Sequence, residues 1–379
     1  MTFLKYPGGK QRELVVIRKY LPEKIENYFE PFVGGGAVYF DTLAEHYYIN
    51  DKSTDLIHLY NAVKTQDEVF FETLHNLDKF WKFLTKFTEK HKDVLKNAYI
   101  KYRDSIITDE EIECLYIGFI EKHKQSLLKE LGNYIDSDVN DLFDEIKKYF
   151  VRKIKSLKKL EFNKEHLPED DIIPNIEGAL KAGFYMYIRH EYNKYLTSDK
   201  NFEDGVIAAF YLFIRETTYS SMFRFNDKGE FNVPYGGISY NNKNFQSKID
   251  DYHSKDLIAR LNNTTIGNED FHEFMNKYSL SKNDFLFIDP PYDSEFSSYD
   301  KSAFEHSDQK RLADYLINHC EAKFMVVIKN TDFIASLYPE GTLCKNGNKL
   351  EVLKFDKKYA VSFMNRNDKK CEHLLIKNY

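Results

Sequence analysis

The sequence contains little cysteine. Of its 379 residues only four are cysteine (Cys114, Cys320, Cys344 and Cys371), and they lie far apart without a Cys-x-x-Cys pair. We therefore expect neither a disulfide framework nor a zinc site. The twelve histidines show no metal-ligand spacing, so the sequence predicts a protein that holds no metal.

Long hydrophobic runs and an excess of positive charge are missing as well. No apolar stretch reaches the roughly 20 residues of a membrane-spanning helix, and residues 1–10 contain no apolar core of a secretory signal. We therefore expect a cytoplasmic protein without membrane contact. The formal net charge of -6 argues against a wholly basic nucleic-acid coat, although it still allows a local basic groove.

The most informative stretch is formed by Asp289, Pro290, Pro291 and Tyr292, which follow the apolar residues 285–288 (FLFI). Such a run, bounded by turn residues, predicts a buried strand of an α/β sheet, and two prolines cannot continue that strand. A carboxylate, backbone carbonyls and an aromatic ring therefore come together at the carboxyl end of a core strand, where open α/β sheets bind ligands. The alternative is a simple proline turn with a surface Asp and Tyr.

Two glycine-containing segments precede this stretch. Residues 3–10 (FLKYPGGK) place a pair of glycines before Lys10, so the backbone there can approach a ligand closely. A phosphate-binding loop needs Gly where Leu4 stands and Ser or Thr where Gln11 stands, so that motif is excluded. The alternative for this segment is a flexible N-terminal turn.

The second segment, residues 25–38 (IENYFEPFVGGGAV), reads as a strand, a glycine-rich turn and the start of a helix. The dinucleotide fingerprint needs a third Gly where Tyr39 stands, and Glu30 at the strand end would repel a pyrophosphate. A carboxylate there suits a cationic or hydroxyl-bearing ligand. The next predicted strand, residues 47–50, leads into Asp51, a position where a ribose diol is commonly held; alternatively Asp51 only neighbours a helix N-cap.

Glycine is scarce from about residue 66 to 200, where long helices with apolar stripes are predicted. The stripe from Phe70 to Leu84 follows the helical period and indicates core packing. Residues 147–160 have an apolar face and a basic face that includes Arg152 and Lys155. This basic face either follows DNA phosphates or is a solvated helix surface.

A polar and aromatic segment, residues 215–237, follows the helices. It carries Tyr219, Ser220, Arg224 and Asn226, and residues 226–229 predict a tight hairpin turn. Arginine, amides, small hydroxyls and an exposed aromatic ring are suited to base-edge contacts and to wedging into a base stack. The segment could equally be a loop packed over a small-molecule site.

The α/β pattern then resumes. Strands are expected at 264–267, 285–288 and 323–329, a helix at 308–320, and an antiparallel pair at 359–363 and 373–376. Because one sheet continues on both sides of the helical block, the sequence predicts an insertion into a Rossmann-like domain and not two domains in tandem.

Taken in order, five motifs carry a family resemblance. They are residues 5–10 (KYPGGK), 30–36 (EPFVGGG), 50–51 (ND), 224–234 (RFNDKGEFNVP) and 289–292 (DPPY). This series resembles the Dam-type DNA adenine-N6 methyltransferases. The resemblance implies an S-adenosylmethionine-dependent enzyme that acts on double-stranded DNA and has a mixed seven-stranded Rossmann-like sheet with an inserted, mainly helical target-recognition domain. We expect the catalytic domain over 1–65 and 240–379 and the recognition domain over 66–239.

The resemblance also implies roles for single residues. Catalytic positions are Asp289, Pro290, Pro291 and Tyr292. Cofactor-binding positions are Tyr6, Gly8, Gly9, Lys10, Glu30, Phe32, Gly34, Gly36, Asp51, Asp270, Phe271 and Asp289. DNA-binding positions are Tyr219, Ser220, Arg224 and Asn226, to which the basic helix face adds Arg152 and Lys155. The chemistry is consistent, because a carboxylate and a carbonyl aimed at an adenine amine favour methylation of its nitrogen, and Tyr292 can stack on an extruded base.

Two departures from the family pattern occur. The chain has Ser220 and Ser221 where the family often has Asn-Gly, and Tyr6 where some relatives have tryptophan. Other hypotheses are a cytosine-N4 methyltransferase, an RNA or protein-glutamine methyltransferase, a catalytically silent DNA-binding module and a nicotinamide-dependent oxidoreductase. We expect a monomer; the target sequence and the existence of a cognate restriction endonuclease stay open.

Overall fold

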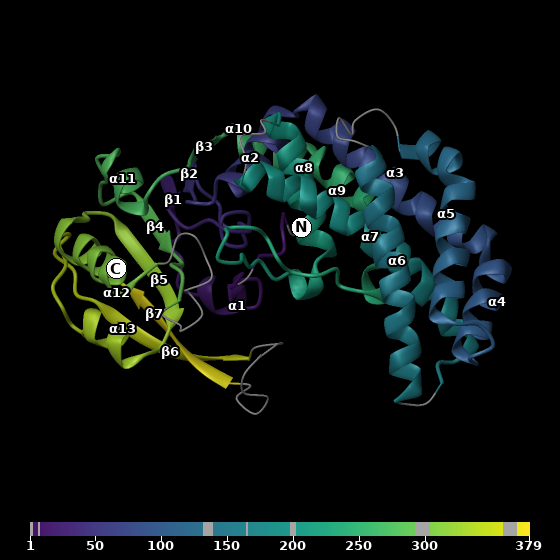
Figure 1. Ribbon diagram of the computed structural model, residues 1–379. Coiled ribbons are helices and arrows are strands. Elements are labelled where there is room, and N and C mark those ends of the chain that lie inside the picture. The colour runs from purple at the N-terminus through teal and green to yellow at the C-terminus, as the bar shows by residue number, and fades with distance from the viewer. Residues whose placement is uncertain are drawn as a thin grey trace. The chain divides into compact units, whose positions relative to one another are not determined.

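The computed structural model describes residues 3–6, 8–131, 139–163, 166–197, 202–292, 304–358 and 370–379. It divides into two compact units (Figure 1). The α/β unit comprises Met1–Lys64 and Lys255–Tyr379, and the helical unit comprises Thr65–Ser254. The helical unit is thus an insertion between two stretches of chain that build one sheet.

The sheet of the α/β unit has seven strands in the order β3-β2-β1-β4-β5-β7-β6. They are β1 (Asn27–Glu30), β2 (His46–Asn50), β3 (Thr264–Gly267), β4 (Phe285–Ile288), β5 (Lys323–Lys329), β6 (Glu351–Lys358) and β7 (Lys370–Lys377). Neighbours from β3 to β5 run parallel, whereas β7 is antiparallel to both β5 and β6. The expectation of a mixed seven-stranded sheet is confirmed.

The strands beside β1 explain where a ligand can bind. All four residues of β4 and the middle five of β5 are buried, as is usual for parallel strands covered on both faces. The chain proceeds from β1 to β2 on one side, whereas β4 pairs with β1 on the other side. This is a topological switch point, and ligands of open α/β sheets bind there at the carboxyl ends of the strands. Glu30 ends β1, and Asp289 directly follows β4.

Short helices complete the α/β unit. They are α1 (Leu14–Ile17), α2 (Thr54–Thr65), α10 (Lys255–Asn262), α11 (Phe271–Asn276), α12 (His306–Asp314), which continues into a π-helical turn (Tyr315–His319), and α13 (Asp332–Leu337). Helix α12 shows why this sequence packs here. Its buried residues Gln309, Leu312 and Ala313 lie at helical spacing and face the sheet core, whereas Lys310 is exposed.

The helical unit contains the long helices α3 (Glu68–Lys90), α4 (Lys92–Arg103), α5 (Asp109–Leu131), α6 (Val139–Phe162), α7 (Glu169–Thr197) and α8 (Asp204–Thr217), followed by α9 (Phe245–Tyr252). The aromatic stripe of α3 is core, as predicted, and Trp81 is fully buried. The Trp81 ring meets Phe213 edge-on at 5.4 Å, and its Nε1 donates to the Asn241 carbonyl at 3.0 Å. The polar atom of this large side chain is therefore satisfied inside the core.

The two ends of the helical unit contact each other. The Gln66 side-chain amide donates to the Tyr252 carbonyl at 3.2 Å, and its Oε1 lies 2.6 Å from Nδ1 of His253. The His253 ring also stacks on Phe71 at 4.1 Å. Residues far apart in sequence are thus joined where the unit begins and ends.

Some expectations from the sequence need correction. The chain after Gly36 forms successive turns and not a regular helix. Residues 240–254 belong to the helical unit, so the division lies after Ser254 and not after residue 239. The reason is that helix α9 packs on α3, a contact that the local sequence does not indicate. The helix expected at 308–320 begins at His306 and changes to π geometry at Tyr315. Strand β7 pairs with β5 and β6, and the strand expected at 359–363 lies outside the described residues.

Candidate active site

The centre of the candidate site is the ammonium group of Lys10. This side chain is only 2% exposed, and its Nζ lies 2.5 Å from Oδ1 of Asp289 and 2.8 Å from the hydroxyl of Tyr292. It also donates to the Gly8 carbonyl at 3.3 Å. Lys10, a predicted cofactor contact, is thus bonded within the protein to the two polar side chains of the Asp-Pro-Pro-Tyr motif and to the Gly8 carbonyl. A buried ammonium of this kind fixes the carboxylate through a charge-assisted hydrogen bond.

The remaining residues of the motif are held from the side of the sheet core. Pro290 is buried and Pro291 is exposed, and the Pro291 carbonyl accepts a hydrogen bond from Nε2 of Gln309 at 2.9 Å. The ring of Tyr292 meets His373 of β7 edge-on at 5.6 Å, and His373 is fully buried. The four motif residues therefore lie together after β4, as the sequence predicts, and the contacts of Pro291 and Tyr292 hold both at defined positions.

The N-terminal segment lies against the glycine-rich turn that follows β1. A Cβ on Gly35 would stand 2.5 Å from the Leu4 carbonyl oxygen, and one on Gly34 would stand 3.0 Å from the Tyr6 ring. Gly34 and Gly36 have φ values of 49° and 69°, which favour glycine. The glycines are thus required both by close approach and by backbone conformation.

The ends of β1, β2 and β3 are tied together by Asn50 and Asp51. Oδ2 of Asp51 accepts from the Gly34 amide at 3.0 Å, and Oδ1 accepts from the Ser53 amide at 2.9 Å. Asn50 is 1% exposed and donates to the Pro31 carbonyl at 3.1 Å and to the Glu269 carbonyl at 3.0 Å. Asp51 was predicted as a ligand contact, and these bonds orient its carboxylate at the glycine-rich turn.

Glu30 is a buried acid at the end of β1. Its Oε2 accepts a hydrogen bond from the Tyr28 hydroxyl at 2.6 Å, and the residue is 2% exposed. Burial raises the pKa of Glu30 well above its ordinary value, and the nearby Asp289 carboxylate raises it further, whereas the Tyr28 hydrogen bond lowers it. The side chain therefore favours its neutral form, in which it can donate as well as accept a hydrogen bond.

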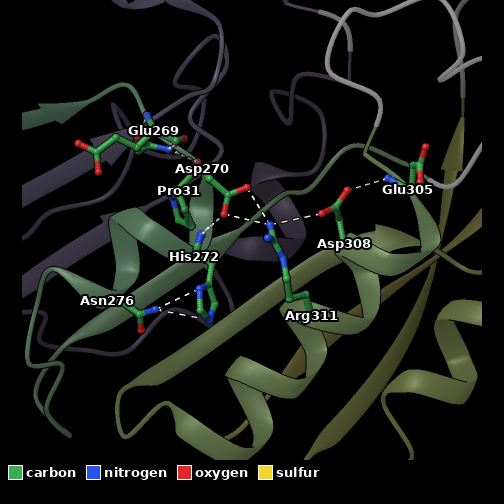
Figure 2. A network of polar contacts seen from close by, with 9 residues as sticks. Pro31, Glu269, Asp270, His272, Asn276, Glu305, Asp308 and Arg311 are labelled. Atoms are coloured by element: carbon green, nitrogen blue, oxygen red, sulfur yellow. Dashed lines mark hydrogen bonds and ion pairs between the residues drawn. The ribbon is translucent and has the colours of Figure 1, made fainter.

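A polar network surrounds the predicted cofactor-binding position Asp270 (Figure 2). Asp270 caps α11 by accepting from the His272 amide at 3.0 Å. The Arg311 guanidinium contacts both carboxylate oxygens of Asp270, at 3.0 and 2.7 Å, and also Asp308 at 3.3 Å. Figure 2 shows Arg311 reaching from α12 towards Asp270, between the two acids. A two-oxygen contact of this kind fixes the direction of the Asp270 carboxylate.

Aromatic rings lie beside that network. Phe271 is 4% exposed, and its ring lies 5.4 Å from that of Phe32 and 5.5 Å from that of Phe304. The Arg311 guanidinium lies over the Phe271 ring at 4.7 Å. Rings next to an oriented carboxylate are suited to a flat heterocycle with an exocyclic amine.

Sequence reasoning missed three residues of this region, namely Asn50 as a tie between strands, Gln309 and Arg311. Asn50 was read only as part of a motif. Gln309 could have been found from its spacing, because it precedes Leu312 by three residues on the apolar face of a predicted helix. Arg311 leaves no such signal, since its partner Asp270 is distant in sequence.

In the helical unit, Tyr219 and Ser220 form an exposed turn. Tyr219 is 47% exposed, and Ser220 has a φ of 53° with its amide donating to the Tyr240 hydroxyl at 3.0 Å. A positive φ at a non-glycine residue is unusual and costs energy. The Tyr219 ring is thus presented by a defined backbone turn.

The predicted hairpin at 226–229 is present. The Gly229 amide donates to the Asn226 carbonyl at 2.8 Å, and Oδ1 of Asn226 accepts from the amides of Lys228 and Glu230 at 3.0 and 2.9 Å. Asn226, expected to contact DNA, therefore closes the turn with its side chain. Arg224 is exposed and held through Nε by Asn232 at 3.0 Å, which leaves its terminal nitrogens accessible.

The two predicted DNA-binding residues on the basic face of α6 have different surroundings. Lys155 lies 2.7 Å from Glu113 of α5, so its charge is already paired. Arg152 is exposed and lies over the Tyr149 ring at 5.7 Å, without an ion pair among the described residues. The two predicted DNA contacts are therefore not equivalent.

Three further observations bear on function. A hollow of about 630 Å³ in the helical unit is lined by Pro174, Glu177, Gly236, Gly237, Ile238, Ser239, Asn241 and Asn242. Within the described part of the chain, no group of three or more His, Cys, Asp or Glu could hold a metal ion. No helix among those residues is long and apolar enough to cross a membrane.

Comparison with known proteins gives consistent results. The family model of the D12 class N6 adenine-specific DNA methyltransferases matches residues 6–120 and 108–353. The type II methyltransferase M.MjaIII of Methanocaldococcus jannaschii is 28% identical over 354 residues, which cover 89% of this chain and 87% of the relative. The type II methyltransferase M.CviBI of Paramecium bursaria Chlorella virus NC1A is 32% identical over 181 residues (47% and 63%). The DNA adenine methylase of Salmonella typhi is 24% identical over 336 residues (87% and 81%).

The family model spans most of the chain, and its matched residues contain all five motifs except Lys5 of the first. The sheet order places the Asp-Pro-Pro-Tyr motif beside the glycine-rich turn. The resemblance expected from the sequence is confirmed, and the chain belongs to the D12 class N6 adenine-specific DNA methyltransferases.

Proposed function

We propose that this DNA adenine methyltransferase takes the methyl group from S-adenosylmethionine and transfers it to N6 of an adenine rotated out of duplex DNA. The observation that carries the proposal is the Lys10–Asp289–Tyr292 cluster, with Nζ at 2.5 Å from the carboxylate and 2.8 Å from the hydroxyl. It stands at the switch point of the sheet, where open α/β sheets bind ligands.

The residues around the glycine-rich turn fit S-adenosylmethionine. The positive φ values of Gly34 and Gly36 give the turn its shape, and Asp51 presents an oriented carboxylate for ribose hydroxyls. Asp270 offers an acceptor for a purine amine, and the buried Phe271 ring packs beside it under the Arg311 guanidinium. When bound, the cofactor supplies an electrophilic methyl group on a sulfonium sulfur.

The adenine amine is a poor nucleophile because its lone pair is delocalised into the ring. In the proposed mechanism the Asp289 carboxylate and the Pro290 carbonyl accept hydrogen bonds from the amine, which favours a tetrahedral nitrogen and stabilises the positive charge that develops on it. Lys10 holds the carboxylate through Oδ1. The Tyr292 ring, positioned by Lys10 and His373, stacks on the extruded base.

We further propose that Tyr219, Ser220 and Arg224 contact the DNA target, because the first two form an exposed turn and the third has accessible guanidinium nitrogens. Two of the relatives are named type II methyltransferases, which supports a partnership with a cognate restriction endonuclease. We propose a monomer as the active form; size measurement by light scattering with and without DNA tests this.

The function is tested with duplex DNA and cofactor carrying a labelled methyl group. After digestion to nucleosides, label is expected on N6-methyladenine. Label on N4-methylcytosine would contradict adenine specificity. Sequencing that detects modified bases on randomised DNA then gives the target sequence. A wild-type protein that binds DNA but does not bind the cofactor and transfers no label would favour a silent DNA-binding module.

A further inference from the structure

A buried glutamine of α12 contacts the catalytic motif from the protein interior. Gln309 is 1% exposed, and its Nε2 lies 2.9 Å from the Pro291 carbonyl oxygen. Because a carbonyl oxygen only accepts hydrogen bonds, the nitrogen of the amide must face it. The orientation of the side chain is therefore determined by chemistry as well as by geometry.

The other end of this amide has no partner among the described residues. Oε1 of Gln309 is buried and accepts no hydrogen bond there. The neighbouring Leu312 and Ala313 on the same helix face belong to the apolar core cluster. A buried acceptor without a partner destabilises a fold, whereas an apolar side chain of similar size would not. Stability alone thus gives no reason for a glutamine at this position.

The contact has a specific mechanical effect on the motif. Proline fixes φ near -65° and peptide groups are planar, so ψ is the one soft backbone torsion of Pro291. The direction of the Pro291 carbonyl reports this torsion. A hydrogen bond to that carbonyl therefore sets the direction in which the chain leaves towards Tyr292.

We propose that Gln309 is a positioning residue for methyl transfer: it fixes the backbone after Pro291 so that Tyr292 meets the target adenine correctly. This inference rests on the proposed function of the Asp-Pro-Pro-Tyr motif. Gln309 acts through the motif and touches neither cofactor nor DNA. The hydrogen bond to Pro291 is expected to raise the rate, whereas the buried Oε1, which has no partner in the described part of the chain, is expected to lower the stability of the fold.

The test uses Gln309→Met, which keeps the length and shape of the side chain but cannot donate. We measure kcat with saturating cofactor and DNA, the Kd of each ligand, and the thermal unfolding midpoint. The expected kcat is lower by about 10- to 100-fold, the effect of a small misplacement of reacting groups. Both Kd values stay within about twofold of wild type, and the midpoint is unchanged or higher because the buried orphan acceptor is removed.

Two further variants sharpen the test. Gln309→Glu has a carboxylate that cannot donate when ionised, so its rate relative to wild type is expected to rise as the pH is lowered and the side chain becomes a donor. Lys310→Met, one residue away on the same helix but exposed, is the control and leaves all measured quantities unchanged.

The outcomes separate this inference from the proposed function. A wild type that methylates adenine and a folded Gln309→Met variant with unaltered kcat would overturn the positioning role alone. If Gln309→Met loses rate together with a lowered unfolding midpoint, and the rate of Gln309→Glu does not rise at low pH, the role of Gln309 is structural and the positioning role is overturned as well. A wild type that transfers no methyl group to adenine would refute the proposed function, and the inference with it.

Discussion

The carboxyl ends of strands β1 and β4 in the α/β unit and the exposed loop around Tyr219 in the helical unit hold their motif residues in different ways. At the carboxyl ends of these strands, Lys10 is 2% exposed and hydrogen-bonded to the side chains of Asp289 and Tyr292. In the loop Tyr219 is 47% exposed, and Arg224 is held through a single nitrogen. Methyl transfer needs fixed geometry, whereas reading DNA needs side chains that can reach it. Intramolecular contacts therefore reveal the chemistry of the first region better than that of the second.

The largest effect on methyl transfer is expected from Asp289, at the carboxyl end of β4. Asp289→Ala removes the proposed acceptor for the adenine amine and the partner of Lys10, and we expect methyl transfer to fall by about 1,000-fold. Cofactor and DNA binding should persist in part, as measured by calorimetry. The exposed Asp332→Asn in the same unit serves as a control. Turnover near the wild-type value would show that the cluster is not catalytic and would remove the contrast between the regions.

A smaller effect is expected at the Arg311–Asp270 pair. Arg311→Met releases the Asp270 carboxylate and uncovers Phe271, so the Kd for S-adenosylmethionine should rise by about fivefold, the range of a partly exposed ion pair. Arg311→Lys should restore part of the affinity, and the DNA Kd should not change. If kcat falls while the cofactor Kd is unchanged, Asp270 is not part of the cofactor site.

The helical unit should respond in DNA binding instead of rate. We expect Arg152→Gln with Lys155→Gln to weaken binding to all DNA sequences. Lys155 is already paired with Glu113 at 2.7 Å. The slope of log binding constant against log salt concentration should therefore decrease in magnitude by about one, which corresponds to the loss of one phosphate contact, that of Arg152. The exposed Lys101→Gln is the control. An unchanged slope would identify this helix face as a solvated surface.

The smallest effects are expected in stability against pH, with opposite signs in the two units. Burial raises the pKa of Glu30, so the α/β unit loses stability as the pH rises above the unfolded value of about 4.3. Glu30→Gln should therefore raise the unfolding midpoint at pH 8 and not at pH 4. Equal midpoints at pH 8 would contradict a raised pKa of Glu30 in the folded protein.

In the helical unit, His91 and His123 have rings 4.4 Å apart, and burial lowers the pKa of both. Stability is therefore lost as the pH falls below the unfolded value of about 6.5, since unfolding then binds protons. His123→Gln should weaken this acid sensitivity. Thermal unfolding between pH 5 and 8 measures it, and an identical pH profile in the variant would exclude the histidine pair as its cause.

The sequence predicted the parts of the fold that depend on local pattern. The runs 285–288 and 323–329 are buried strands as expected, because continuous apolar residues need cover on both faces. Resumption of the α/β pattern near residue 264 correctly indicated an insertion. By contrast, the turns after Gly36 resemble a helix start in sequence, whereas the glycines there are explained by the close approach of Leu4 and Tyr6 to Gly34 and Gly35 and by the positive φ values of Gly34 and Gly36.

The partners within the site could not be predicted, since they depend on distant contacts. Lys10 and Asp289 are 279 residues apart, so local pattern could not show that the Lys10 ammonium contacts Asp289 and Tyr292. Asn226 has the composition of a base-reading residue, but its side chain closes the turn in which it lies. Polar side chains have several possible partners, and the fold selects among them.

The contact between Gln66 and residues 252–253 has a consequence for the order of folding. The helical unit is one continuous stretch, and it is synthesised completely before β4. If it folds first, its ends are already together, and the sheet has to close only a short connection between α2 and α10 instead of a loop of the whole insertion. We expect amides of α3 and α8 to gain protection from hydrogen exchange before those of β4 during refolding; the opposite order would contradict this. The entropic cost of closing the sheet around an insertion of this length is then small.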